Sequence, residues 1–220
     1  MADGDPPAGP SILVCFAVKE EAKFFQPEKV SPSCEVLVTG MGKRNAERNA
    51  RTALDRELPE LVVTAGFAGG LNPGLALNTI VFDSEDEQLT QRLISAGAVR
   101  SAFHCADRVV VTAAEKAELC KASGADAVEM ESGVIRAVCR ERQVASATVR
   151  AISDAAGDDL PLDFNALMNA NDEIDYLKLA RTVAFAPGRI PALLRFQRQT
   201  NAAALALADA LHRSLGGRGR

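Results

Sequence analysis

The chain has 220 residues, enough for one domain with a substantial core or at most two small domains. Its 47% apolar and 25% charged residues are usual for a soluble globular protein. A formal net charge of −4 argues against nucleic acid or an anionic membrane surface as a partner. Aromatic residues make up only 5% of the chain, without any tryptophan, which argues against a platform that stacks on the bases of a nucleic acid.

The five cysteines are odd in number and scattered, with neither a Cys-x-x-Cys motif nor a Cys/His metal spacing. We therefore expect reduced thiols in a cytoplasmic protein. The two histidines, His104 and His212, lie far apart in the chain, so neither a zinc site nor a Ser-His-Asp triad is expected. We expect no metal ion and no cofactor.

One domain is predicted over residues 11–215, because no internal repeat or linker divides the chain. Residues 1–10 lack the basic start and apolar segment of a signal peptide and are expected to form a disordered lead-in. Residues 216–220 are expected to form a flexible tail. No apolar run reaches the ~20 residues that a bilayer span requires, so no membrane insertion is expected.

Short apolar runs, each bounded by turn signals, predict strands along the whole chain. These runs cover residues 11–18, 34–40, 60–66, 78–83, 107–112 and 145–153. Apolar residues at helical spacing predict helices at 43–58, 113–123 and 131–143, with a last helix beginning at Pro191 and covering about 191–214. Strands that are apolar almost throughout and alternate with helices predict an α/β domain, with a largely parallel sheet covered on both faces.

Ligands of open α/β sheets bind beyond the carboxyl ends of the strands, and four motifs occupy such positions. In "AVKEEAKFF" the first strand ends and Glu20 and Glu21 begin a helix, where acids also serve to complement the helix dipole. In "TGMGKRN", residues 39–45, a Gly-x-Gly turn leads into a helix that carries Lys43 and Arg44. Such a turn can bind an anion, and a tight turn with solvated basic residues is the alternative.

The third motif, "TAGFAGGLNPG" at residues 64–74, places several glycines after a strand, which permits backbone contact with a ligand. A purely structural loop is its alternative. In the fourth, "AVEMES" and "VRAISDAAGDD" are apolar runs that end in acids: Glu129 and Glu131 in the first, Asp154 in the second. A buried carboxylate is costly unless it is paired, so these acids indicate a site. A structural ion pair between Arg150 and one of the acids is the alternative.

"TAGFAGGL", "AVEMES" and "VRAISDAA", in this order and with "AVKEEA" near the start, resemble the purine nucleoside phosphorylase/uridine phosphorylase superfamily. Residues 12–155 are most similar to its methylthioadenosine/S-adenosylhomocysteine nucleosidases. "VVVTAAEKAEL" and the C-terminal "APGRIPALLRFQRQTNAAALALADAL" instead resemble the hopanoid-associated phosphorylases, a sister group that acts on an adenosyl lipid. The resemblance implies a three-layer α/β/α sandwich with a mixed central sheet.

The resemblance also implies roles for the acids near the sugar and the base. Asp154 matches the acid that hydrogen-bonds or protonates the leaving purine at N7. Glu131 matches the carboxylate that holds the ribose 2′ and 3′ hydroxyls, and Met130 matches the side chain packed against the sugar. Glu129 lies nearby, with a less defined role.

On the other side of the expected site, Glu21 matches the carboxylate that orients the attacking water. Arg150 matches the arginine near the nucleophile, and Ala68 and Gly69 lie in the loop expected to line the nucleoside site. Phe67 stands where the nucleosidases usually have a small polar residue. The Ser-Gly-Asp run that usually follows the fifth strand is replaced by "VTAAEK".

The sequence therefore predicts an enzyme that cleaves the N-glycosidic bond of a purine nucleoside, a 5′-substituted adenosine, with a homo-oligomer as the expected assembly. Hydrolysis is favoured over phosphorolysis, because Glu21 would repel an incoming phosphate. The first alternative is a phosphorylase of the hopanoid-associated type, with inorganic phosphate as co-substrate. A non-catalytic nucleoside-binding module, for which Phe67 is the one hint, is the second. A domain whose acids make only structural ion pairs is the third.

Overall fold

The computed structural model describes residues 12–169, 175, 177–178, 181 and 187–216. The expected lead-in at 1–10 and residues 217–220 of the expected tail lie outside this range. In the described part of the chain, no helix combines the length and the apolar character that crossing a membrane requires.

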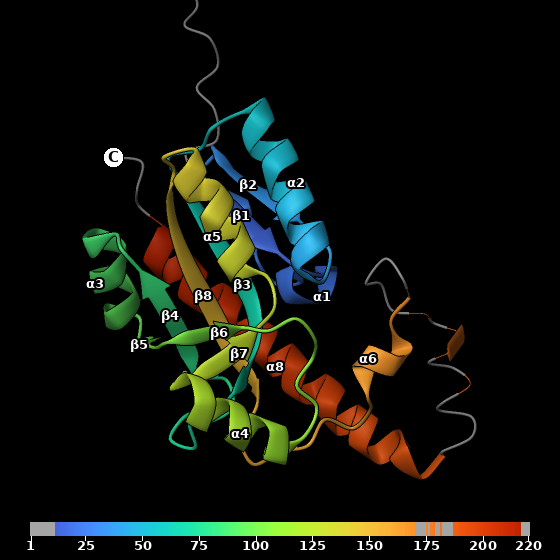
Figure 1. The fold of residues 1–220 in the computed structure, drawn as a ribbon. Coiled ribbons are helices and arrows are strands. Elements are labelled where there is room, and N and C mark those ends of the chain that lie inside the picture. Colours follow the sequence, from blue (N-terminus) through green and yellow to red (C-terminus); the bar gives the residue numbers. More distant parts are fainter. Residues whose placement is uncertain (1–11, 170–174, 176, 179–180, 182–186, 217–220) are drawn as a thin grey trace, which may run out of the picture.

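A mixed sheet of eight strands forms the middle layer (Figure 1). Its strands are β1 (Ile12–Phe16), β2 (Cys34–Val38), β3 (Leu61–Gly70), β4 (Ile80–Ser84), β5 (Val99–Arg100), β6 (Phe103–Cys105), β7 (Ala127–Glu129) and β8 (Ala145–Asp154). The main order is β2-β1-β3-β8-β4-β5, and β7 pairs with β3 and with β6. β2, β1, β3 and β8 are parallel neighbours, whereas β4 runs antiparallel to β8 and β7 runs antiparallel to β3. The mixed sheet of the expected three-layer sandwich is confirmed.

Helices cover both faces of the sheet (Figure 1). They are α1 (Lys19–Ala22), α2 (Lys43–Arg56), α3 (Glu87–Ser95), α4 (Ala113–Ser123), α5 (Ser132–Glu141), α6 (Phe164–Leu167) and α8 (Ile190–Leu215), with 3₁₀ turns at Pro27–Lys29 and Pro187–Arg189. Alternate residues of each strand face opposite sides, so one strand serves two cores. In β1, Val14 packs in the core shared with α3 and α8, and Leu13 packs in the core shared with α2 and α5.

The strand expected at residues 107–112 is wrong. This segment is irregular backbone that leads into α4, and its polar groups find partners outside the sheet. The side chain of Asn165 bonds both the N–H and the carbonyl of Val109, and the N–H of Leu160 donates to the carbonyl of Val111. A partly buried segment needs its backbone hydrogen bonds satisfied, and here a later loop satisfies them instead of a neighbouring strand.

Helix α3 is absent from the predicted elements, although Asp86 caps it by accepting the N–H of Leu89 at 2.9 Å. The helix has nine residues, and its buried side chains are Leu89, Thr90 and Leu93. Three positions on a segment this short are too few for a helical period to stand out.

Candidate active site

The candidate residues gather where the carboxyl ends of β1, β3, β7 and β8 meet. β3 lies between β1 and β8, and its last residues also pair with β7. Gly69 therefore lies opposite Val128 on one side and Asp154 on the other, with a shift in register between Ala68 and Gly69. Irregularities of this kind re-aim the neighbouring side chains. The glycine-rich end of β3 thus brings the two acid-bearing strands to one place.

Glu21 lies in α1, just beyond the end of β1, and is buried. Its Oε2 atom accepts the N–H groups of Ala17 at 2.9 Å and Val18 at 3.2 Å, and its Oε1 atom accepts the N–H of Phe67 at 2.8 Å. A Cβ atom at Gly66 would lie 2.5 Å from Oε1, so a side chain there would displace the carboxylate. Burial raises the pKa of Glu21 against the opposing effect of these hydrogen bonds, which makes it a stronger proton acceptor.

Glu129 and Arg150 form a buried ion pair. Arg150 Nη2 lies 2.7 Å from Glu129 Oε2, and the two side chains are 3% and 1% exposed. Oε2 also accepts the N–H groups of Glu131 and Ser132, and Oε1 accepts the Ser132 hydroxyl. Burial alone would raise the pKa of Glu129, but Arg150 and Ser132 outweigh it and hold the pKa below its ordinary value. The ion pair considered as an alternative for one of the acids therefore involves Glu129.

Glu131 is half-buried and stands at the N-terminal boundary of α5. Its Oε1 atom accepts the N–H of Gly42 at 2.8 Å, so the Gly-x-Gly turn after β2 binds an anionic side chain of the chain itself. Burial, together with the charges of Glu129 and Glu21, raises the pKa of Glu131 to about 7. This carboxyl group therefore changes its charge near neutral pH.

Asp154 lies at the end of β8 and is 8% exposed. Its Oδ1 atom accepts the hydroxyl of Ser153 at 2.7 Å, and its Oδ2 atom lies 2.5 Å from Nζ of Lys116 in α4. A Cβ atom at Gly69 would lie 3.1 Å from Oδ2, so this glycine allows the carboxylate to approach β3. Two of its neighbours therefore fix the orientation of Asp154.

The other candidate residues differ in exposure. Ala68 is buried, whereas Phe67, Gly69 and Met130 are half-buried. Phe67 packs against the core that α8 helps to form, and its N–H group donates to Glu21. The side chain of Phe67 therefore contributes to the hydrophobic core.

Gly42, Ser132 and Lys116 contact the candidate acids but were not predicted as site residues. The turn that contains Gly42 was noted as an anion-binding candidate, and its partner proves to be Glu131. Ser132 immediately follows Glu131, so its proximity to the site was visible in the sequence. Lys116 gave no such signal, because it lies among charged residues in a segment that reads as a solvated helix.

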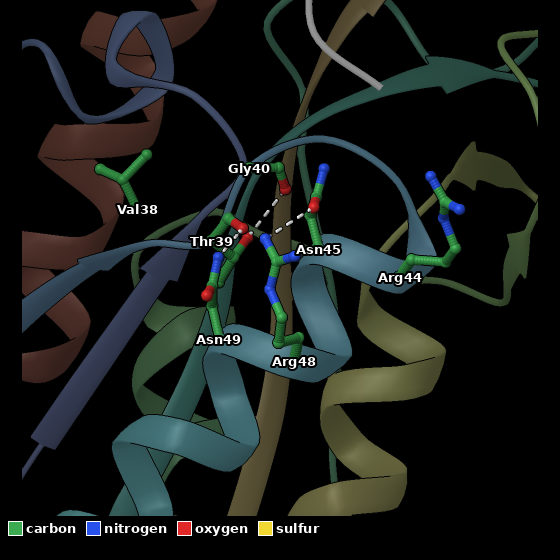
Figure 2. Close-up of a pocket in the computed structure, with 7 residues that line it drawn as sticks. All are labelled: Val38, Thr39, Gly40, Arg44, Asn45, Arg48 and Asn49. Carbon is green, nitrogen blue, oxygen red and sulfur yellow. Dashed lines mark hydrogen bonds between the residues drawn. The ribbon is translucent and has the colours of Figure 1, made fainter. Parts of the chain in front are cut away.

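A hollow of about 710 Å³ lies beside this site, between the end of β2 and the first turns of α2 (Figure 2). Its lining residues are Val38, Thr39, Gly40, Arg44, Asn45, Arg48 and Asn49. Arg48 donates to Asn45 at 3.0 Å, and Asn49 donates to the carbonyl of Thr39 at 2.7 Å. None of the residues that line the hollow is a candidate acid. The candidate active site is therefore the acid cluster and not this hollow. Within the described residues, no group of three or more His, Cys, Asp or Glu side chains is arranged to hold a metal ion.

Known proteins resemble parts of this chain. Residues 84–183 match the sequence model of the phosphorylase superfamily. The 5′-methylthioadenosine/S-adenosylhomocysteine nucleosidase of Shewanella loihica is 29% identical over 171 residues, which cover 61% of this chain and 74% of that protein. The nucleosidase of the same name from Listeria monocytogenes is 26% identical over 186 residues, which cover 67% of this chain and 80% of that protein.

Solved structures share the fold at lower sequence identity. The corresponding nucleosidase from Neisseria meningitidis, in complex with methylthio-immucillin-A, has a TM-score of 0.69 and 18% identity over 93% of this chain and 98% of that one. Native futalosine hydrolase of Helicobacter pylori has a TM-score of 0.60 and 17% identity over 91% and 96%. These structures share the α/β/α fold of this chain, and the acid cluster at the carboxyl ends of its strands is the candidate site. Over residues 84–183 the chain is thus similar to the phosphorylase superfamily.

We predict that Glu129→Gln destabilises the fold by about 3–5 kcal/mol, because it leaves the buried guanidinium of Arg150 without its counter-charge. Glu131→Gln is the matched control: it is close in sequence, and its carboxyl group accepts from a backbone N–H without an ion pair to Arg150 in the structure. Urea unfolding of both variants measures the difference. Equal stability of the two variants would contradict the structural role of Glu129.

Proposed function

We propose that this protein is a purine nucleosidase that hydrolyses the N-glycosidic bond of a 5′-substituted adenosine and releases the base. The observation that carries the proposal is the convergence of three carboxyl groups, Glu21, Glu131 and Asp154, at the carboxyl ends of β1, β7 and β8. The names of its relatives support the substrate class. The complex of a related fold with adenine agrees with a base-binding site.

Each of the three acids has a task that its surroundings suit. Glu21 has a raised pKa and accepts a proton from the attacking water. Glu131 binds the ribose hydroxyls, with Met130 against the sugar. Asp154 faces the base and shares a proton with purine N7 as negative charge develops there. Glu129 forms an ion pair with Arg150 and also accepts the backbone N–H of Glu131, and these contacts position the sugar-binding acid.

Water, rather than phosphate, suits the surroundings of Glu21. Phosphate would need a cation to balance its charge, and the charge of Arg150 is already balanced by its buried ion pair with Glu129. An anion beside the Glu21 carboxylate would meet a like charge in a poorly solvated site. Water meets no such repulsion and donates its proton to Glu21.

We also propose that the protein acts in the cytoplasm as a homo-oligomer, with no cofactor. All five cysteines are free thiols, which agrees with a reducing compartment. Val36 and Val38 are 38% and 39% exposed on β2, which lies at one end of the sheet. Exposed apolar residues on an edge strand suit contact with a second copy.

Base release from four nucleosides tests the function. We expect 5′-methylthioadenosine and S-adenosylhomocysteine to release adenine faster than adenosine, and inosine to be the slowest of the four. In excess inorganic phosphate the expected sugar product is the free sugar. Sugar 1-phosphate would identify a phosphorylase instead, and binding without release of any base would identify a nucleoside-binding module.

We predict that Asp154→Asn lowers kcat by about 10²–10⁴-fold, because an amide of the same size cannot share a proton with the leaving base. Nucleoside binding should change little, so KM or a directly measured Kd separates the two effects. If the variant keeps most of its turnover, Asp154 does not face the base.

We predict that kcat/KM for a ribonucleoside falls as pH decreases through about 7. The pKa of Glu131 is raised to about 7, and the ionised form is the one that accepts the sugar hydroxyls, so protonation below this pH removes the acceptor. Profiles of the wild type and of Glu131→Gln should differ in this acidic limb. A limb of the same midpoint in the variant would assign it to another group.

A further inference from the structure

We propose that the first half of α8 is an amphipathic helix that docks the protein peripherally on an anionic lipid surface. α8 has 26 residues, and all of its buried side chains lie between Ala203 and Leu215. Its second half therefore packs on the sheet, whereas its first turns reach beyond the sheet (Figure 1). The packing of the domain thus gives no reason for the apolar residues at the start of this helix.

A stripe of exposed apolar side chains, which consists of Ile190, Leu194 and Leu205, runs along one side of α8. Their exposed fractions are 42%, 50% and 59%. The spacing i, i+4, i+15 places the three side chains close to one line along a helix. Single exposed apolar residues are normal on a protein surface, whereas an aligned series of large ones indicates contact with another apolar phase.

Other sides of these turns are fixed to the domain. The ring of Phe196 packs against that of Phe164 in α6, with 5.6 Å between the ring centroids. Nζ of Lys23, at the end of α1, donates to the side chain of Asn201 at 3.1 Å. The helix is therefore formed before it meets a partner, and docking does not have to order it.

The charge of this segment is opposite to that of the whole chain. Residues 187–208 contain Arg189, Arg195 and Arg198 and neither aspartate nor glutamate, whereas the chain has a net charge of −4. The three arginines are exposed, and none of them belongs to an ion pair between described residues. Because charges in salt solution act only over about 8–10 Å, the local charge governs what this helix attracts.

An anionic lipid surface matches both features of the segment. Aliphatic side chains enter the boundary between headgroups and acyl chains, and arginines beside them bind the lipid phosphates. A nucleic acid would pair with the arginines but leave the apolar stripe in water. A symmetric contact with a second copy would bring the same arginines of both copies toward each other, which is unfavourable.

The experiment is co-sedimentation of the full chain with vesicles of phosphatidylcholine, with or without phosphatidylglycerol. We expect binding to the anionic vesicles to be about tenfold tighter or more than binding to phosphatidylcholine alone, because each arginine near the surface adds attraction. The preference should weaken as the salt concentration is raised.

Two double variants separate the apolar contribution from the charge. Ile190→Ser with Leu194→Ser should weaken binding to the anionic vesicles by about tenfold, because serine gains little from the acyl boundary. Arg195→Gln with Arg198→Gln should weaken it by about tenfold as well and remove most of the preference for the anionic lipid. The four side chains are at most half-buried, so both variants should keep the fold, which circular dichroism checks.

Matched controls come from other helices of the same domain. Ile94 in α3 is 50% exposed, as Leu194 is, and Arg140 in α5 is exposed like the arginines of α8. Ile94→Ser and Arg140→Gln should bind the vesicles as the wild type does. A loss in these variants equal to that of the α8 variants would overturn the proposal, since it would make binding a property of the whole surface.

Three further results would also overturn the proposal. The first is a wild type that does not sediment with anionic vesicles. The second is unchanged binding of the folded Ile190→Ser, Leu194→Ser variant, which would leave charge attraction without a docking helix. The third is an oligomer that this variant breaks into monomers in the absence of vesicle binding, which would assign the stripe to a second copy of the chain.

Discussion

The buried ion pair of Arg150 and Glu129 is the constraint on which the site depends. A guanidinium in the middle of β8 is tolerable only with a counter-charge, and the chain places Glu129 at the end of β7 to supply it. The same carboxylate binds the backbone N–H groups of Glu131 and Ser132, which fixes the junction between β7 and α5. The two acids of "VEMES" therefore have separate tasks. Glu129 fixes the conformation of the turn between β7 and α5, and this turn positions Glu131.

The convergence of Glu21, Glu131 and Asp154 could be predicted because each acid ends an apolar run or begins the helix after one. The hydrogen-bond and ion-pair partners of each acid could not be predicted from the sequence. Glu129 and Glu131 both follow the same strand, and which of them meets Arg150 depends on where β7 stops and the chain turns into α5. Gly42 and Lys116 come from elements that are remote in sequence. Local patterns carry no information about which loop lies over which strand end.

The same limit of local sequence patterns applies to the prediction of helices and strands. The observed bounds of helix α4 agree with those predicted from its helical pattern, and the structure shows that a capping box of Thr112 and Glu115, contained within four residues, fixes its start. The apolar run at 107–112 has the pattern of a strand, but its partners are Asn165 and Leu160, some fifty residues further along the chain. An apolar run reports burial, and whether a buried run joins a sheet depends on which neighbour satisfies its backbone.

Under the proposed function, the excess of carboxyl groups over cations in the site contributes to catalysis. Four carboxyl groups, Glu21, Glu129, Glu131 and Asp154, gather near two cations, Arg150 and Lys116, and each cation pairs with one acid. The two acids left over are Glu21 and Glu131, and these are the ones whose pKa is raised. A sugar that loses its base becomes positively charged, and two acids that have no ion pair of their own gain a cationic partner at that moment. Their interaction with the sugar is therefore stronger in the transition state than in the ground state, which is the condition for lowering the barrier.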